Sequence, residues 1–229
     1  RPEAGRRPAE GRPEAGRQAG RAAGQKAGRR PAGRPAERLS TRMEGQDKAL
    51  LSLAGSPLVK HTIDRLENQV DGLVINVNQN HNQYEKFNFP LISDTIGGHL
   101  GPLAGILSGM NYASAHNYTH VITAASDTPF FPLNLRDKLF DETFDITVAK
   151  TISEVDKNNL HPTFGLWSVK LRSSLHKALS GDIRKVMAFV KLNKWKAIEW
   201  EKKDNDPFFN INTPSDMIDA EWIIKREIK

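Results

Sequence analysis

The chain has 229 residues, a formal net charge of +6 and no cysteine, so neither a disulfide nor a thiolate metal site is available to it. Residues 1–38 carry 11 basic and 4 acidic side chains, which leaves 22 basic and 23 acidic side chains for the rest of the chain. This nearly neutral remainder has no basic stripe for nucleic acid, and no apolar run approaches the roughly 20 residues that span a bilayer. We therefore expect a cytoplasmic protein with no nucleic-acid and no membrane partner.

Residues 1–38 consist of Arg, Ala, Gly, Pro, Glu and Gln with one Lys, and contain no Val, Ile, Leu, Met or aromatic residue. The sequence Arg1-Pro-Glu-Ala-Gly-Arg6 recurs at residues 12–17. Such a segment lacks the apolar surface that would offset the loss of chain entropy on folding. We predict a basic low-complexity tail over residues 1–38, either disordered or a mistranslated N-terminus, followed by one folded domain over residues 39–229.

From Leu39 onward, apolar runs alternate with helical stretches, as expected of βαβ units with a mostly parallel sheet. Strands are expected at residues 72–78, 89–93, 119–125, 146–149, 163–167 and 196–200, and helices at 50–69, 102–114, 133–140, 170–179, 183–190 and 214–224. The strands at 72–78 and 119–125 have the apolar character of central strands, and Pro57 should break or restart the first helix. The predicted fold class is α/β.

Polar side chains follow three of these strands: Asn76, Asp94 and Asp127. Ligands of open α/β sheets bind outside the carboxyl ends of the strands, so these side chains are expected to share one pocket. Asp127 is the candidate metal ligand, because Mg²⁺ on a triphosphate takes one or two carboxylates and leaves its other positions to phosphate and water. The alternatives are structural: Asp127 could cap the following helix, and Asp94 could open an Asx turn.

Arg42 and Lys48 lie on either side of a glycine just before a predicted helix. Basic groups beside a helix N-terminus suit phosphate and can neutralise charge that develops during phosphoryl transfer, although a solvated polar loop would look the same. The glycines of residues 97–105 would let the backbone approach a purine or ribose. His161 could titrate near neutral pH, but we interpret it as a structural hydrogen-bonding or substrate-lining residue.

These segments, in this order, resemble the molybdenum cofactor guanylyltransferase family over nearly all of residues 39–224. The segments that carry the resemblance are Leu39-Ser-Thr-Arg-Met43 with Asp47-Lys48, Pro57-Leu58, Val74-Ile-Asn-Val-Asn78, Asp94, Gly101-Pro-Leu-Ala-Gly-Ile106, Asp127-Thr-Pro129, His161-Pro-Thr-Phe-Gly-Leu-Trp167, Asp182-Ile-Arg-Lys-Val186 and Phe208-Phe-Asn-Ile-Asn-Thr-Pro214. The last three favour the molybdopterin branch over other nucleotidyltransferases. The resemblance implies a single Rossmann-like three-layer domain with a mostly parallel sheet.

The resemblance also implies the reaction: transfer of GMP from Mg²⁺-bound GTP to the terminal phosphate of molybdenum-bound molybdopterin, with release of pyrophosphate. The substrate phosphate is the nucleophile, so catalysis would consist of in-line positioning and electrostatic stabilisation. The implied partners are GTP, the pterin, and cofactor-synthesis proteins or apomolybdoenzymes, and we expect a monomer. The implied roles are GTP phosphate binding for Lys48 with Arg42 as a further phosphate partner, nucleoside binding for Asn76 and Asp94, and Mg²⁺ and GTP binding for Asp127. The candidate pterin contacts are Arg184, Lys185, Asn210 and Asn212, and the alternative for these four is a position on a helix surface or a helix-capping role.

The N-terminus departs from the family, which begins with a buried apolar strand that runs into Leu-Ala-Gly-Gly. This chain has Pro35-Ala-Glu-Arg38 in that place. The side chains of Glu37 and Arg38 would obstruct close approach of the backbone to phosphate, and Glu37 would repel a triphosphate. Proline also lacks the donor that a central strand needs. We therefore expect that the domain lacks its usual first strand. We also expect that the chain binds GTP weakly when residues 1–38 are as they stand in this sequence.

Three other functions stay open on the sequence. The first is a related nucleotidyltransferase that uses CTP or another acceptor. The second is an inactive binding module that docks onto molybdoenzymes or cofactor-synthesis proteins. The third is nucleic-acid binding through the arginine-rich tail, which would depend steeply on salt.

Overall fold

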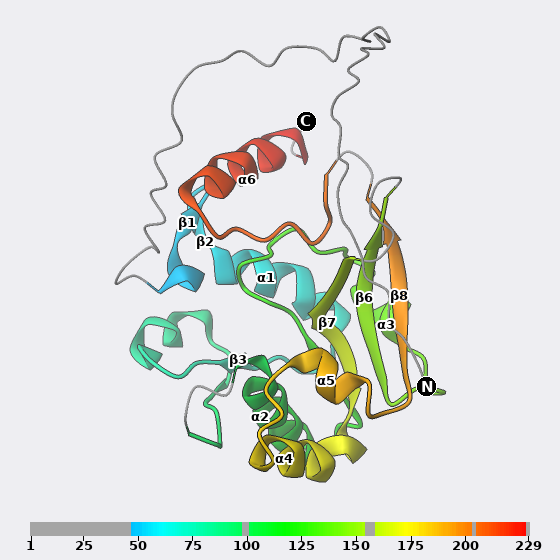
Figure 1. Ribbon diagram of the computed structural model, residues 1–229. Helices are drawn as coiled ribbons and strands as arrows, with labels where there is room; N and C mark the ends of the chain where they lie inside the picture. The colour runs from blue at the N-terminus through cyan, green and yellow to red at the C-terminus, as the bar shows by residue number, and fades with distance from the viewer. Residues whose placement is uncertain (1–46, 98–100, 154–158, 203–204, 228–229) are drawn as a thin grey trace, which may run out of the picture. The chain divides into compact units, whose positions relative to one another are not determined.

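The computed structural model describes residues 47–97, 101–153, 159–202 and 205–227 (Figure 1). The predicted tail and Arg42 lie outside these residues. The α-helices are α1 (Leu58–Leu66), α2 (Pro102–Ala115), α3 (Leu135–Leu139), α4 (Arg172–Ser180), α5 (Val186–Val190) and α6 (Pro214–Glu227). The strands are β1 (Ser52–Leu53), β2 (Ser56–Pro57), β3 (Ile75–Asn76), β4 (Leu91–Ile92), β5 (His120–Thr123), β6 (Ile146–Ile152), β7 (Asn159–Ser168) and β8 (Trp195–Glu201). No helix within these ranges is long and apolar enough to cross a membrane.

The α/β class is confirmed, but the described strands form a mixed sheet where a mostly parallel one was expected. The main sheet has the order β5-β7-β6-β8, in which β7 is antiparallel to both neighbours and β6 is parallel to β8. β7 begins seven residues after β6 ends. A connection this short can join antiparallel neighbours, whereas a parallel pair needs a crossover of a dozen or more residues. A second, two-stranded sheet pairs β3 with β4 in parallel.

Helices cover both faces of the main sheet, as a three-layer fold requires. On one face, Ile146 and Val148 of β6 pack with the buried side chains of α2, α4 and α5. On the other face, Phe164 and Leu166 of β7 pack with Leu135 and other residues of the α3 region. Figure 1 shows α2, α4 and α5 gathered together beside the strands. The period of two along each strand therefore supplies apolar side chains to two separate cores.

The first helix is shorter than the predicted range of residues 50–69. A β-hairpin of β1 and β2 precedes it, with Ala54 and Gly55 at the turn in left-handed backbone conformations, φ 49° and 87°. Pro57 is the N-cap of α1, so the predicted restart at this proline is confirmed. Proline suits a helix start because its fixed φ and missing N–H cost nothing there.

The strands around residues 72–78 and 119–125 were predicted to be central, and for the described part of the chain this is wrong. β5 lies at one end of the main sheet and bonds only to β7, while β3 bonds only to β4. All four residues of β5 are partly exposed, whereas Ile146, Val148 and Ala149 of the interior strand β6 are fully buried. No described strand pairs with the second edge of β3 or of β5.

His161 has the structural role that we expected from the sequence. Its Nε2 atom lies 2.7 Å from the hydroxyl of Thr151, and its ring stacks on Phe208 with centroids 4.6 Å apart. Burial lowers the pKa of His161, and the negative charge of Asp206 opposes this effect only in part. Burial therefore disfavours the charged form of this partly exposed histidine and lowers its pKa.

We expect the free energy of unfolding to decrease as the pH is lowered from 7.5 to 5.5. The unfolded chain takes up a proton near the ordinary histidine pKa of about 6.5, whereas the folded chain resists it, so stability is lost as the pH falls through this range. Urea unfolding at the two pH values measures the difference. His161→Gln should make the dependence shallower, and an unchanged dependence in this variant would contradict the assignment.

Candidate functional site

Lys48 is the centre of a cluster that joins three distant parts of the chain. Its Nζ donates to Oδ2 of Asp127 at 2.7 Å, to Oδ1 of Asn212 at 2.7 Å and, more weakly, to Oδ1 of Asn210 at 3.5 Å. The side chains of Lys48 and Asp127 are 31% and 25% exposed, so the ion pair remains open to solvent and to a ligand. The structure thus brings together four of the predicted site residues.

Asp47 positions Lys48, and Tyr84 positions Asp47. Oδ1 of Asp47 accepts the backbone N–H of Ala49 at 3.2 Å and caps the short 3₁₀ helix Lys48–Leu50. Oδ2 accepts the hydroxyl of Tyr84 at 2.6 Å, and burial together with this carboxylate raises the pKa of Tyr84 well above its usual value. We did not predict these two roles. An aspartate directly before a helix start is a capping signal that identifies Asp47, but no sequence pattern indicates Tyr84.

The turn that carries Asn210 and Asn212 is held by the N-terminus of α6. The carboxylate of Asp216 accepts the backbone N–H groups of Asn212 and Thr213, each at 2.8 Å, and the Thr213 hydroxyl accepts the N–H of Asp216 at 3.2 Å. Partial burial raises the pKa of Asp216, but these hydrogen bonds and the charge of Lys48 outweigh burial and hold the pKa below its ordinary value. This reciprocal capping, which the Thr-Pro-Ser-Asp sequence indicates, orients Asn212 toward Lys48.

A second polar cluster lies where β3 and β4 end. Nδ2 of Asn76 and Nδ2 of Asn78 each donate to the carboxylate of Asp94 at 2.8 Å, and the N–H of Asp94 donates to Oδ1 of Asn78 at 2.9 Å. Asn76 and Asp94 were predicted to meet, whereas Asn78 was not predicted. A Cβ atom on Gly105 of α2 would lie 2.6 Å from Nδ2 of Asn76. The glycine therefore leaves the room that the asparagine amide occupies.

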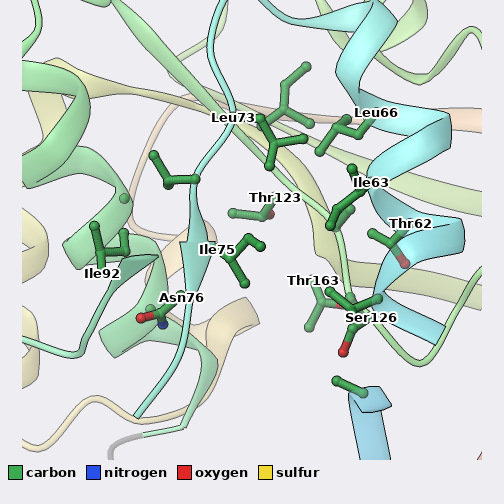
Figure 2. Close-up of a pocket in the computed structure, with 18 of the residues that line it drawn as sticks. Thr62, Ile63, Leu66, Leu73, Ile75, Asn76, Ile92, Thr123, Ser126 and Thr163 are labelled. Carbon is green, nitrogen blue, oxygen red and sulfur yellow. The ribbon is translucent and has the colours of Figure 1, made fainter. Parts of the chain in front are cut away.

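Asn76 and Asp127 line the same cavity, of about 440 Å³. Figure 2 shows Asn76 and Ser126 among its polar lining residues and Ile63, Leu66 and Ile75 among the apolar ones. One residue of each polar cluster therefore lines this cavity, beside the carboxyl ends of β3 and β5, where open α/β sheets bind ligands. Most of its other lining residues are apolar.

Arg184 and Lys185 do not join either cluster among the described residues. The Arg184 guanidinium donates to Oδ1 of Asp182 at 2.7 Å and to the carbonyl of Leu179 in the last turn of α4. Lys185 is the N-cap residue of α5. The geometry favours the helix-capping alternative for Arg184, whereas the side chain of Lys185 makes no capping hydrogen bond.

The oxygen atoms available at this site suit a metal ion whose ligands are mainly phosphate and water better than a metal ion bound entirely by protein side chains. The described residues contain no group of three or more His, Asp or Glu side chains able to hold a metal ion. Asp127 is the carboxylate of the Lys48 cluster, and its Oδ1 receives only a 3.4 Å hydrogen bond from the hydroxyl of Thr128. One hard carboxylate oxygen with an open side is what Mg²⁺ uses when phosphates and waters complete its shell.

Comparison with known proteins adds independent information. A family model described as the MobA-like NTP transferase domain matches residues 37–197. A molybdenum cofactor guanylyltransferase from Rhodopseudomonas palustris (strain BisB5) is 38% identical over 196 residues, which cover 82% of this chain and 91% of that protein. One with the same name from Yersinia pestis (strain Pestoides F) is 37% identical over 177 residues, which cover 77% of this chain and 87% of that protein.

Solved structures show the same fold. Molybdopterin-guanine dinucleotide biosynthesis protein A from Archaeoglobus fulgidus superimposes with a TM-score of 0.59 at 22% identity, covering 81% of this chain and 94% of that one. The 4-diphosphocytidyl-2C-methyl-D-erythritolsynthase from Anaerococcus prevotii gives a TM-score of 0.60 at 15% identity, covering 78% and 93%. At these identities the likeness concerns the fold alone.

We expect Gly105→Ala to displace the Asn76 amide from Asp94 with little change in stability. Alanine gains about 1 kcal/mol of helix propensity over glycine, which offsets a lost hydrogen bond of about 1 kcal/mol. The side-chain amide resonance of Asn76 in NMR spectra, together with urea unfolding, measures both effects. Gly109→Ala, on the same helix, is the matched control, because its Cβ would meet Val121 and not Asn76. An Asn76 resonance that moves equally in both variants would refute the steric role of Gly105.

Proposed function

This chain belongs to the MobA-like NTP transferase family and is a nucleotidyltransferase, and we propose that it transfers GMP from GTP to molybdenum-bound molybdopterin. The relatives that carry the name molybdenum cofactor guanylyltransferase support this reaction. The observation that carries the proposal is the Lys48 ammonium, held in place by Asn212 and by Asp127, which lines the cavity. This positive charge would attract the phosphates of a nucleotide bound there.

In this reaction a phosphate oxygen of the pterin attacks the α-phosphorus of GTP. A new phosphorus–oxygen bond forms, the bond from the α-phosphorus to the bridging oxygen of the β-phosphate breaks, and pyrophosphate leaves. Lys48 would exchange its contact with Asp127 for the phosphates and neutralise the charge that develops on the leaving group. Because the pterin supplies the nucleophile, no side chain of the protein has to form a covalent bond.

Asp127 would hold Mg²⁺ that enters with GTP, once Lys48 has turned toward the phosphates. When bound, the ion would neutralise phosphate charge and help to align the reacting groups. The exchange is energetically feasible, since a partly exposed ion pair such as that of Lys48 and Asp127 contributes on the order of 1 kcal/mol.

Asp94 would bind the nucleoside, with Asn76 and Asn78 fixing its carboxylate. Each asparagine donates one hydrogen bond to it, which leaves further lone pairs free to accept from base or ribose donors. The amino group of guanine is such a donor, but so is the amino group of cytosine. A CTP-dependent reaction is therefore the second candidate.

Asn210 and Asn212 are our proposed pterin-side contacts, because both are exposed and both accept hydrogen bonds from the Lys48 ammonium. Arg184 and Lys185 have weaker support, since the Arg184 guanidinium is already bonded to Asp182 and Leu179. Cofactor-synthesis proteins and apomolybdoenzymes would receive the product.

Calorimetric titration of Mg²⁺-GTP tests the function directly. One sample is the literal chain, and the other replaces residues 1–38 by an apolar strand that ends in Leu-Ala-Gly-Gly. Binding by the second protein alone is expected, because its glycines would let the backbone approach the phosphates. If neither protein bound Mg²⁺-GTP, or if CTP bound more tightly than GTP, the assignment to GTP would be overturned.

We expect Lys48→Met, made in the protein that binds GTP, to lower kcat/KM for guanylyl transfer at least 100-fold. A loss of about 2.7 kcal/mol is typical when one preorganised donor to transition-state charge is removed. Pyrophosphate release measures the rate. Lys60→Met is the matched control, because Lys60 is an exposed lysine on α1 that pairs only with Asp64 in the described structure. Equal rates in the two variants would remove Lys48 from the mechanism.

A further inference from the structure

The hydrogen-bond partners of the Lys48 ammonium are three side-chain oxygen atoms. Oδ2 of Asp127 and Oδ1 of Asn212 each lie 2.7 Å from Nζ, and Oδ1 of Asn210 lies 3.5 Å from it. An ammonium has three N–H donors, so these oxygens match its bonding capacity. Carboxylate and amide oxygens are also the ligands that hard divalent cations such as Mg²⁺ and Mn²⁺ prefer. Lys48 therefore occupies a place that suits a metal ion.

Two carboxylates belong to this arrangement, whereas Lys48 supplies one positive charge. Asp127 contacts the ammonium directly, and Asp216 accepts the backbone N–H groups of Asn212 and Thr213 at 2.8 Å. Without the charge of Lys48, two negative charges would remain near the amide oxygen of Asn212. The side chains of Lys48 and Asp127 are 31% and 25% exposed, so a hydrated ion can reach them.

A divalent cation and the Lys48 ammonium compete for Oδ2 of Asp127. Both use lone pairs of the same oxygen, and their positive charges repel each other at contact distance. Mg²⁺ binds oxygen at about 2.0–2.1 Å, so it would enter the space between the oxygens where Nζ now lies. The ammonium therefore has to leave before a metal ion can enter.

Phosphate can release Lys48 without leaving its charge uncompensated. The lysine stem is flexible, and phosphate oxygens form strong charge-assisted hydrogen bonds with an ammonium. A triphosphate carries enough negative charge to compensate both Lys48 and a divalent cation at Asp127. A metal ion that entered without phosphate would instead take the anionic partner of Lys48 and place a second positive charge beside it.

We propose that the Lys48 ammonium holds the place of a divalent cation in the free protein, so that Asp127 and Asn212 accept a metal ion only when phosphate draws Lys48 away. Metal and nucleotide then bind together, and free metal ions are excluded from the site. The Nδ2 groups of Asn210 and Asn212 take no part in this contact and stay available to the pterin. The inference rests on the proposed binding of Mg²⁺ by Asp127, but not on the base or the acceptor.

Titration of MnCl₂ into the full chain without nucleotide tests the proposal. The electron paramagnetic resonance signal measures free Mn²⁺, and line broadening in NMR spectra locates the bound ion. Lys48→Met should bind Mn²⁺ roughly tenfold or more tightly than the unmodified chain, because ligand charge sets metal affinity. Broadening is expected at residues 126–128 and 210–213. Equal affinities, or broadening confined to other residues, would overturn the proposal.

Lys48→Arg and Lys60→Met are the matched controls. Arginine keeps a positive charge beside Asp127, so this variant should gain no affinity for Mn²⁺. Lys60→Met removes the partner of Asp64 on α1 and shows whether freeing any carboxylate is enough. If either control gained as much affinity as Lys48→Met, exclusion of the metal by the charge at this site would be refuted.

Two further variants protect the result against an effect of the methionine side chain. Lys48→Ala should show the same gain as Lys48→Met, and Asp127→Asn added to Lys48→Met should abolish it. A gain that survived Asp127→Asn would be fatal to the proposal. Because no nucleotide is present, these outcomes are distinguishable from failure of the proposed function: a chain that transfers no guanylyl group would still show the gain, and an active enzyme could lack it.

Discussion

The contact of Lys48 with Asp127 and Asn212 is the constraint on which the arrangement of the site depends. It fastens together the start of the described chain, the segment after β5 and the turn before α6. A backbone hydrogen bond of 2.8 Å from Ile211 to the carbonyl of Asp127 holds the last two segments in register. Lys48 therefore joins these three segments, because its ammonium group has oxygen partners in both of the other two.

The ion pair itself is weak, so its geometry must be maintained by its surroundings. Asp47 and Tyr84 fix the backbone below Lys48, and the capping arrangement of Thr213 and Asp216 fixes Asn212. In the proposed mechanism, a phosphate would replace the contacts of Lys48 with Asp127 and Asn212 and would leave these supporting bonds in place. The elements that carry Lys48 would then keep their positions, as preorganised electrostatic stabilisation requires.

The cavity of the site lies between β3 and β5, each of which pairs on one edge among the described strands. β5 has the apolar sequence of an interior strand, yet all four of its residues are partly exposed. Asp127 lies four residues after the end of β5, and Asn76 belongs to β3. The separation of these two strands therefore sets the distance between the two polar clusters.

By itself, the sequence determined the α/β class, the positions of most elements and the meeting of Asn76 with Asp94, because apolar periodicity and polar residues after strands are local signals. It also indicated that Asn210, Asn212, Lys48 and Asp127 belong to functional segments. Only the tertiary structure decided that β7 is antiparallel, that Arg184 caps α4, that Tyr84 supports Asp47 and that β3 and β5 each pair on one edge among the described strands. The contact of Tyr84 with Asp47 and the neighbours of β3 and β5 join segments far apart in the sequence, and contacts at that range leave no periodicity in the chain. The pairing of β7 with β6 and the contacts of Arg184 join nearby segments, but packing selects these partners and the apolar pattern does not indicate them.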